Sequence, residues 1–112
     1  MLLILEDMEI KLQELLGQKK QNGESFDKIV LYFTATWCGP CKLIAPVVEE
    51  LSNGEDYRDS ILFVKIDVDE CEQLMNECEV SCMPTFLFYS GNQKVDTLEG
   101  CDENQLRMKV AM

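Results

Sequence analysis

Two cysteines, Cys38 and Cys41, have the residue type and spacing that disulfide chemistry requires. They lie in the segment TWCGPCK at 36–42, directly after an apolar run at 29–33 that predicts a strand. The amphipathic pattern after them predicts a helix, in which positions i and i+3 have Cα atoms ~5 Å apart. Because a disulfide spans such a separation, the pair can open and close with little backbone movement. The sequence therefore predicts a reversible redox couple.

The order strand, short turn and helix gives the two thiols different environments. Cys38 is expected at the helix N-terminus, where unpaired N–H groups and the helix dipole favour a thiolate, the species that attacks a disulfide. Cys41 falls inside the first turn, deeper in the fold, and is suited to resolve the mixed disulfide that results. Around them, Gly39 leaves room for a substrate backbone, Pro40 stiffens the turn, and Trp37 is expected to shield one side of the sulfur.

The segment WCGPCK at 37–42 is identical to the active-site signature of the thioredoxin family, which the sequence resembles over nearly its whole length. The resemblance implies an oxidoreductase that reduces protein disulfides through this pair. A structural zinc half-site and a chance pair of cysteines are the alternatives for such a motif. The other matching positions are Pro46, Asp67-Val68-Asp69, Met83-Pro84-Thr85-Phe86, Gly91 and Gly100.

Apolar runs and turn residues predict an α/β fold in a single domain over residues 1–112. The order βαβαβα followed by ββα implies parallel pairing in the first half and an antiparallel hairpin in the second. Such an order resembles the thioredoxin fold, a central mixed sheet with helices on both faces. The expected strands are 2–5, 29–33, 61–68, 85–89 and 94–99.

Capping residues and apolar spacing mark the expected helices. The helix that follows Cys38 is expected to end near Ser52 and to bury one apolar stripe. This stripe consists of Leu43, Ile44, Val47, Val48 and Leu51. The expected caps of the other helices are Asp7, Asp69 paired with Glu72 in a capping box, and Asp102 paired with Gln105.

Pro84 is the second candidate site. A proline that opens a strand needs no functional explanation, but the resemblance implies a cis Met83–Pro84 bond in a loop that faces the active-site sulfurs. Met83 would then offer its backbone to an extended substrate segment, as in strand addition. The implied docking surface consists of Trp37, Gly39, Pro40, Met83, Pro84 and Gly100.

Tyr32 is a departure from the family pattern. Many relatives have a buried aspartate six residues before the first cysteine, and it is thought to handle the proton of the second one. A phenol, with a reference pKa of about 10, is a poor base near neutral pH. We therefore expect Cys41 to be activated through water or less efficiently. Lys65, in the next apolar strand, either hydrogen-bonds to Tyr32 and favours a thiolate, or extends to the strand edge.

Four further cysteines lie outside the motif. Cys71 and Cys78 share one face of a predicted helix, about 10.5 Å apart along its axis, so they cannot bridge each other there. Small buried apolar side chains are the simplest interpretation of both. Cys82 and Cys101 are expected near the docking surface. The pattern resembles animal cytosolic thioredoxins, and we hypothesise that Cys82 is a regulatory thiol that forms an intermolecular disulfide on oxidation.

Composition limits the partners and the compartment. A net charge of −11 argues against nucleic acid and anionic membranes and favours partners with a basic contact surface. The chain has no histidine, so imidazole is excluded as a base or metal ligand. No apolar run approaches membrane-spanning length, and the apolar start is too short for a signal core. The six cysteines therefore predict reduced thiols in the cytoplasm.

The source of electrons is expected to be another protein. The sequence has no flavin or nicotinamide fingerprint, so no cofactor is expected beyond the Cys38–Cys41 disulfide. The resemblance implies thioredoxin reductase as donor, protein disulfides as substrates, and a monomer that forms a disulfide-linked dimer when oxidised. Two other classes compete: a regulatory subunit whose thiols gate its association, and a metal-binding thiol protein, although the cysteine spacings match no standard zinc pattern.

Overall fold

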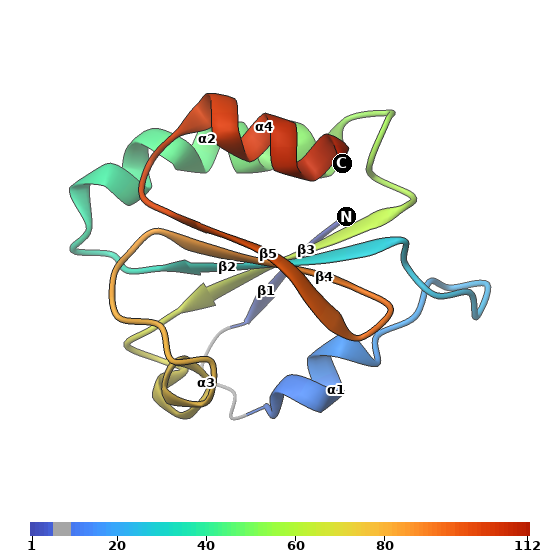
Figure 1. Cartoon of the computed structure of the whole chain (residues 1–112), viewed down its shortest axis with the longest axis horizontal. Helices are drawn as coiled ribbons and strands as arrows, with labels where there is room; N and C mark the ends of the chain where they lie inside the picture. The colour runs from blue at the N-terminus through green and yellow to red at the C-terminus, as the bar shows by residue number, and fades with distance from the viewer. Residues whose placement is uncertain (6–9) are drawn as a thin grey trace.

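The computed structural model describes residues 1–5 and 10–112. Strands and helices follow one another in the predicted order, with most ends shifted by a residue or two (Figure 1). The expected cap at Asp7 lies outside the described residues. The strands are β1 (Leu2–Leu5), β2 (Lys28–Thr34), β3 (Ile61–Asp67), β4 (Thr85–Ser90) and β5 (Gln93–Glu99). The helices are α1 (Leu12–Leu16), α2 (Gly39–Asn53), α3 (Glu72–Glu77) and α4 (Glu103–Ala111).

The strands form one mixed sheet in the order β1-β3-β2-β4-β5. The pairs β1–β3 and β2–β3 are parallel, whereas β2–β4 and β4–β5 are antiparallel. The parallel half therefore comes from the βαβαβ part of the chain and the antiparallel half from the C-terminal hairpin, which confirms the predicted fold class. Strand β2 lies at the centre of the sheet, and α2 begins a few residues after its end.

Helices cover both faces of the sheet: α2 and α4 lie on one face, and α1 and α3 on the other (Figure 1). Alternate residues of β2 divide between the two cores, with Val30 packing on the α2/α4 side and Leu31 on the α1/α3 side. All seven residues of β2 are buried. This burial explains why residues 29–33 of β2 form an unbroken run of apolar and aromatic residues that does not alternate with polar ones.

The α2/α4 face becomes polar where β2 and β3 end. In the parallel register, Tyr32 pairs with Lys65 and Thr34 pairs with Asp67. Paired residues of adjacent parallel strands point to the same face of a sheet, and so do residues two apart on one strand. The four side chains therefore form one polar cluster at the C-terminal ends of β2 and β3, next to the start of α2. We call this cluster the polar edge.

Two predictions about helices are wrong and one is confirmed. Leu43 is 74% exposed although the apolar stripe included it, whereas the other four residues of that stripe are buried. Helix α3 begins at Glu72 after Cys71, without a side-chain cap, so the predicted box of Asp69 and Glu72 does not form. Helix α4 starts as predicted, because the Asp102 side chain accepts a hydrogen bond from the Gln105 N–H at 3.0 Å.

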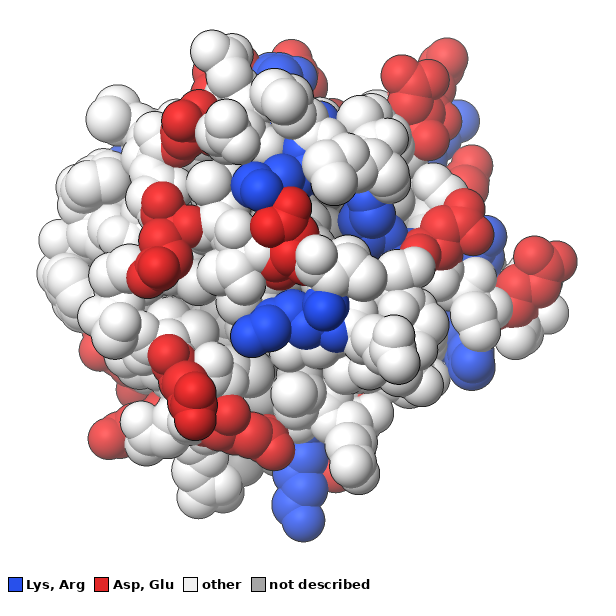
Figure 2. All heavy atoms as spheres, in the orientation of Figure 1, with Lys and Arg blue, Asp and Glu red and all other residues white. Residues whose placement is uncertain are grey.

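The surface carries both signs of charge. Figure 2 shows carboxylates spread over the viewed face and out to its edges, with lysine and arginine side chains between them. This view shows no broad basic patch of the kind that binds a phosphate backbone, in keeping with the net charge of −11. None of the helices in the described part of the chain is long and apolar enough to cross a lipid bilayer.

Candidate active site

Cys38 and Cys41 form a disulfide at the start of α2, with their Cα atoms 5.3 Å apart. Cys38 is the N-cap residue, and its Sγ accepts a hydrogen bond from the Cys41 backbone N–H at 3.1 Å. Pro40 occupies the first turn, where its missing N–H leaves no donor unsatisfied. Cys38 is 4% exposed and Cys41 2%, so in this oxidised state the expected difference in depth is small.

The loop before β4 brings the second predicted site against the disulfide. The Met83–Pro84 bond is cis, as the resemblance implied. The Met83 carbonyl oxygen lies 3.7 Å from Cys38 Sγ. Gly100 donates its N–H to the Pro84 carbonyl oxygen at 2.9 Å, in a conformation with φ of 100° that favours glycine. Residues far apart in sequence are therefore held together around Cys38.

Trp37 lies mostly in solvent at the edge of this site, with 65% of its surface exposed. Its indole N–H donates to the Asp69 carboxylate at 2.9 Å. Asp69 therefore fixes the orientation of the indole instead of capping α3. Sequence reasoning assigned this aspartate wrongly, although it belongs to the Asp67-Val68-Asp69 motif that pointed to the family.

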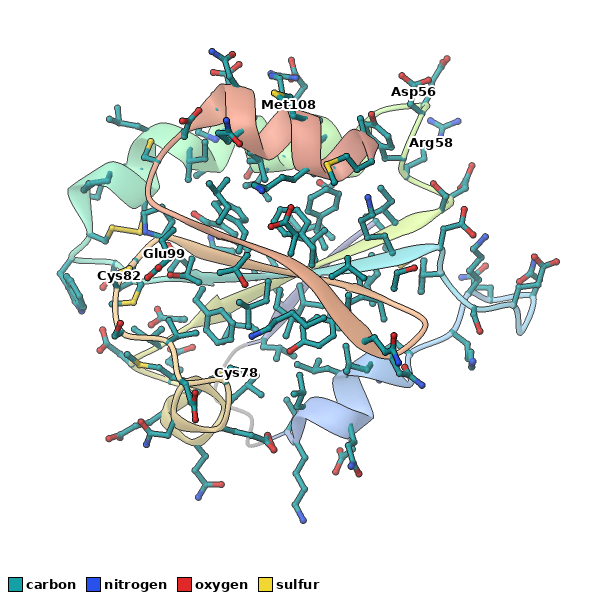
Figure 3. The ribbon with its side chains drawn as sticks, viewed as in Figure 1. Asp56, Arg58, Cys78, Cys82, Glu99 and Met108 are labelled. Atoms are coloured by element: carbon teal, nitrogen blue, oxygen red, sulfur yellow. A yellow bond between two sulfur atoms is a disulfide. The ribbon has the colours of Figure 1, made fainter. Side chains whose placement is uncertain are left out.

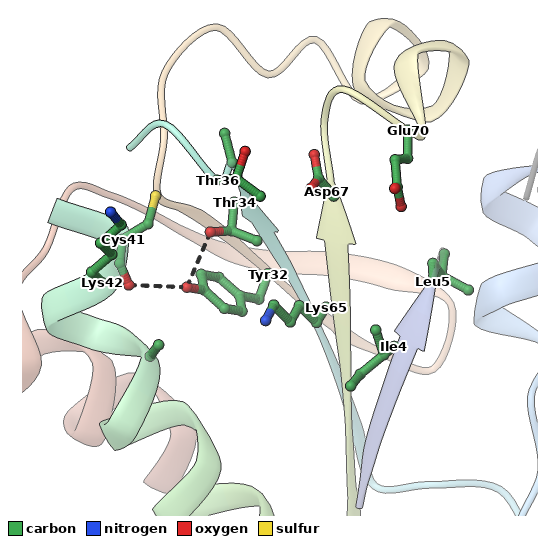
Figure 4. Close-up of a pocket in the computed structure, with 12 residues that line it drawn as sticks. Ile4, Leu5, Tyr32, Thr34, Thr36, Cys41, Lys42, Lys65, Asp67 and Glu70 are labelled. Atoms are coloured by element: carbon green, nitrogen blue, oxygen red, sulfur yellow. Dashed lines mark hydrogen bonds between the residues drawn. The ribbon is translucent and has the colours of Figure 1, made fainter. Parts of the chain in front are cut away.

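Tyr32 contacts the active-site helix from behind the disulfide. Its hydroxyl donates to the Cys41 carbonyl oxygen at 3.3 Å and lies 3.3 Å from Thr34 Oγ1 (Figure 4). Its ring stacks on Phe86 of β4, with centroids 4.9 Å apart. Burial raises the pKa of the phenol, which disfavours the phenolate still further. Of the two alternatives for Lys65, the hydrogen bond to Tyr32 does not form among the described residues, and the Tyr32 hydroxyl instead contacts Thr34 and Cys41.

The other cysteines that show a clear pKa shift are less acidic than usual. Cys82 donates its thiol hydrogen to the Glu99 carboxylate at 2.9 Å, and this hydrogen bond raises the pKa of Cys82 (Figure 3). Burial, aided by the charge of Glu77, raises the pKa of Cys78 to about 11. Sequence reasoning did not identify Glu99, because the contact joins residues 17 apart through the β4–β5 hairpin.

The remaining thiols differ in position. Cys71 is buried at the start of α3, whereas Cys101 is exposed beside Gly100. No three His, Cys, Asp or Glu side chains among residues 1–5 and 10–112 are grouped so that they could hold a metal ion. The described residues therefore offer a redox pair and scattered single thiols.

A mixed sheet that carries a Cys-x-x-Cys disulfide at a helix N-terminus, next to a cis-proline loop, defines a dithiol–disulfide oxidoreductase. A family model of thioredoxin matches residues 16–112. The chain belongs to the thioredoxin family, as its motif indicated.

Animal thioredoxins are among the similar proteins. A thioredoxin of Ictalurus punctatus is 47% identical over 85 residues, which are 75% of this chain and 78% of that protein. Thioredoxin-1 of Caenorhabditis elegans is 49% identical over 82 residues, 73% of this chain and 69% of that one. The crystal structure of reduced Schistosoma mansoni thioredoxin pre-protein matches with a TM-score of 0.81 and 38% identity, over 98% of this chain and 95% of that one.

Proposed function

We propose that this protein reduces disulfides in other proteins, with Cys38 as the nucleophile and Cys41 as the resolving thiol. The observation that carries the proposal is the position of Cys38 Sγ at the N-terminus of α2, where it accepts the Cys41 N–H at 3.1 Å. An N–H donor and the positive end of a helix dipole both stabilise a thiolate. The same sulfur lies 3.7 Å from the Met83 carbonyl oxygen, where an approaching peptide would contact the loop.

The reaction proceeds in two exchanges. The Cys38 thiolate attacks one sulfur of a substrate disulfide, the substrate S–S bond breaks, and the other substrate sulfur leaves as a thiolate. Cys41 then loses its proton and attacks Cys38 Sγ in the mixed disulfide. The Cys38–Cys41 bond forms and the second substrate thiolate leaves. The substrate has gained two electrons, and the enzyme is left oxidised.

The docking surface is made of the residues that surround Cys38. Trp37, Gly39 and Pro40 are exposed on one side, and Met83 and Gly100 are partly exposed on the other. An extended substrate segment pairs with the backbone of Met83, as in strand addition. Pro84 is buried behind this loop and shapes it.

Electrons return to the protein from thioredoxin reductase, and no bound cofactor takes part. The thiol pair is the only redox group that this cycle needs, because each exchange moves an electron pair between sulfur atoms.

The protein works in the cytoplasm, where glutathione and reductases keep thiols reduced. It acts as a monomer and forms a disulfide-linked dimer through Cys82 under oxidation, since Cys82 is partly exposed. Cys82 lies directly before Met83 in the loop between α3 and β4, which we call the docking loop.

The test is the reduction of insulin disulfides driven by dithiothreitol, followed by turbidity. The native protein is expected to turn over, and Cys38→Ser to give only the background rate. Circular dichroism of both proteins confirms that they are folded, and thiol titration confirms that they are reduced. A folded, reduced native protein without turnover would overturn the proposal.

A further inference from the structure

The second exchange requires a proton to leave a buried site, and the structure indicates its route. Cys41 carries its proton as a thiol until it attacks Cys38, so the proton must pass to a base when the Cys38–Cys41 bond forms. Cys41 is 2% exposed at the start of α2. The inference that follows rests on the proposed function, because it concerns the resolving step.

A cavity of about 500 Å³ adjoins Cys41 on the side away from the docking loop. The polar edge of the sheet lines it, as Figure 4 shows for Tyr32, Thr34, Lys65 and Asp67. Its other lining residues include the exposed Lys42 and Glu70, so the cavity runs from the buried residue Cys41 to solvent. This volume is many times what one water molecule needs, so a chain of water molecules fits.

Most side chains around this cavity cannot take a proton. The Tyr32 hydroxyl already donates to the Cys41 carbonyl oxygen, and burial raises its pKa, so it stays neutral. Threonine hydroxyls are not bases, and the ammonium groups of Lys42 and Lys65 have donors only. Carboxylates accept, and two of them line the cavity: Asp67 on the polar edge and Glu70 on the exposed turn after β3.

Asp67 is the better placed of the two carboxylates. It is partly buried, and in the strand register it pairs with Thr34. The Thr34 hydroxyl contacts the Tyr32 hydroxyl, which in turn donates to the Cys41 carbonyl oxygen. The Asp69 N–H donates to Asp67 Oδ1 at 2.9 Å, which fixes the carboxylate at the strand end. A carboxylate has lone pairs for further donors, so it can accept a hydrogen bond from cavity water as well.

We propose that water in this cavity relays the proton of Cys41 to Asp67, which acts as the proton acceptor of the resolving step. Asp67 then returns the proton to solvent past Glu70 and Lys42. Lys65 adds a positive charge on the same edge and favours the Cys41 thiolate. Asp67 thereby supplies a carboxylate base near Cys41, which the neutral Tyr32 side chain cannot do.

The test separates the two exchanges with a symmetric aromatic disulfide, dithiobis(nitrobenzoate). The attack by Cys38 releases one coloured thiolate and the attack by Cys41 releases a second, so stopped-flow absorbance resolves both phases. The background carries Cys101→Ser to remove the exposed extra thiol and Cys82→Ser to remove the thiol in the docking loop. In Asp67→Asn the amide oxygen can still accept the Asp69 N–H, so the fold is expected to persist.

Asp67→Asn is expected to slow the second phase by about 10²-fold, the lower end of what a positioned base contributes, and to leave the first phase unchanged. Added imidazole or formate, at constant pH and ionic strength, should restore part of the rate, because small bases can enter the cavity. Asp59→Asn, in the loop before β3 at the opposite end of the sheet, is the control with the same charge change.

Each outcome has a distinct meaning. If the rate of the second phase in Asp67→Asn stayed within twofold of the parent rate and did not depend on added base, the proton route would be overturned while the proposed function stands. Equal slowing by Asp59→Asn would show a general charge effect and would overturn it too. Absence of the first phase in the parent would contradict the attack by Cys38 itself, and with it both proposals.

Discussion

Cys38 lies against the docking loop and Cys82 lies within it, and the structure places their sulfur atoms in opposite environments. Cys38 Sγ accepts an N–H at a helix N-terminus, where a negative charge is stabilised. Cys82 donates its hydrogen to the Glu99 carboxylate, where a negative charge is repelled. Only Met83 separates Cys82 from Pro84 in sequence, and the Met83 carbonyl lies 3.7 Å from Cys38 Sγ. We therefore expect the groups that contact each sulfur, more than its place in the fold, to decide which thiol reacts.

The largest expected effect distinguishes the two members of the active-site pair from each other. Cys38→Ser should lose all turnover of insulin disulfides, since no nucleophile remains at the N-terminus of α2. Cys41→Ser should accumulate a stable mixed disulfide on Cys38, because nothing resolves it. Intact-mass spectrometry detects the adduct. Cys82→Ser is the matched control and should keep full turnover; its loss would mean that the contrast between the two regions is wrong.

The next largest effect is expected in the alkylation rate of Cys78. With its pKa at about 11, roughly one thiol in 10³ is ionised at pH 8, against roughly a quarter for an unperturbed thiol. Its alkylation by iodoacetamide should therefore be over a hundredfold slower in the folded, reduced protein than in the same protein unfolded in urea, and should rise tenfold per pH unit up to about pH 11. Equal rates in both states would contradict the assigned environment.

The contact between Cys82 and Glu99 predicts a smaller, few-fold effect. The carboxylate raises the pKa of Cys82, so thiolate forms only at higher pH. Glu99→Gln removes the charge and should shift the alkylation profile of Cys82 to lower pH, with a severalfold higher rate at pH 8. Peptide mapping after iodoacetamide labelling measures this rate. Glu103→Gln on α4 carries the same charge change, and a shift of equal size there would argue against the specific contact.

Tyr32 predicts the smallest effect, on stability. Tyr32→Phe keeps the stacking on Phe86 but removes the hydroxyl that donates to the Cys41 carbonyl. Loss of one hydrogen bond should lower the free energy of unfolding of the oxidised protein by ~1 kcal/mol. Urea titration measures it, with Tyr57→Phe as the control at a partly exposed tyrosine. No difference between the two variants would mean that the Tyr32 hydroxyl does not support α2.

The sequence predicted the features that local patterns encode. The strand–turn–helix order placed Cys38 at a helix start, and the apolar runs located the strands. The Asp102 cap was also predicted, because its partner is three residues away. Such features depend on neighbours in the chain, where residue type and spacing are sufficient evidence.

The errors came from contacts across the fold. Asp69 bonds Trp37 from 32 residues away, so it does not cap α3. Tyr32 reaches the Cys41 carbonyl, and Glu99 reaches Cys82 through the hairpin. Leu43 has the spacing of a buried residue but lies on the open side of α2, because the buried stripe is narrower than the pattern suggested. The proposed roles of the docking residues stay predictions until they are tested.

The most direct measurement is competitive labelling of all six cysteines in the fully reduced protein. A limiting amount of iodoacetamide is added between pH 6 and pH 9, and peptide mapping gives a rate for each thiol. Cys38 is expected to be modified first at every pH up to 8, at least tenfold faster than Cys82 near neutrality. Of the two thiols whose pKa is raised, Cys78 is expected to be the slower. If Cys82 matched Cys38 near pH 7, partner groups would not decide reactivity in this fold, and the central claim would be wrong.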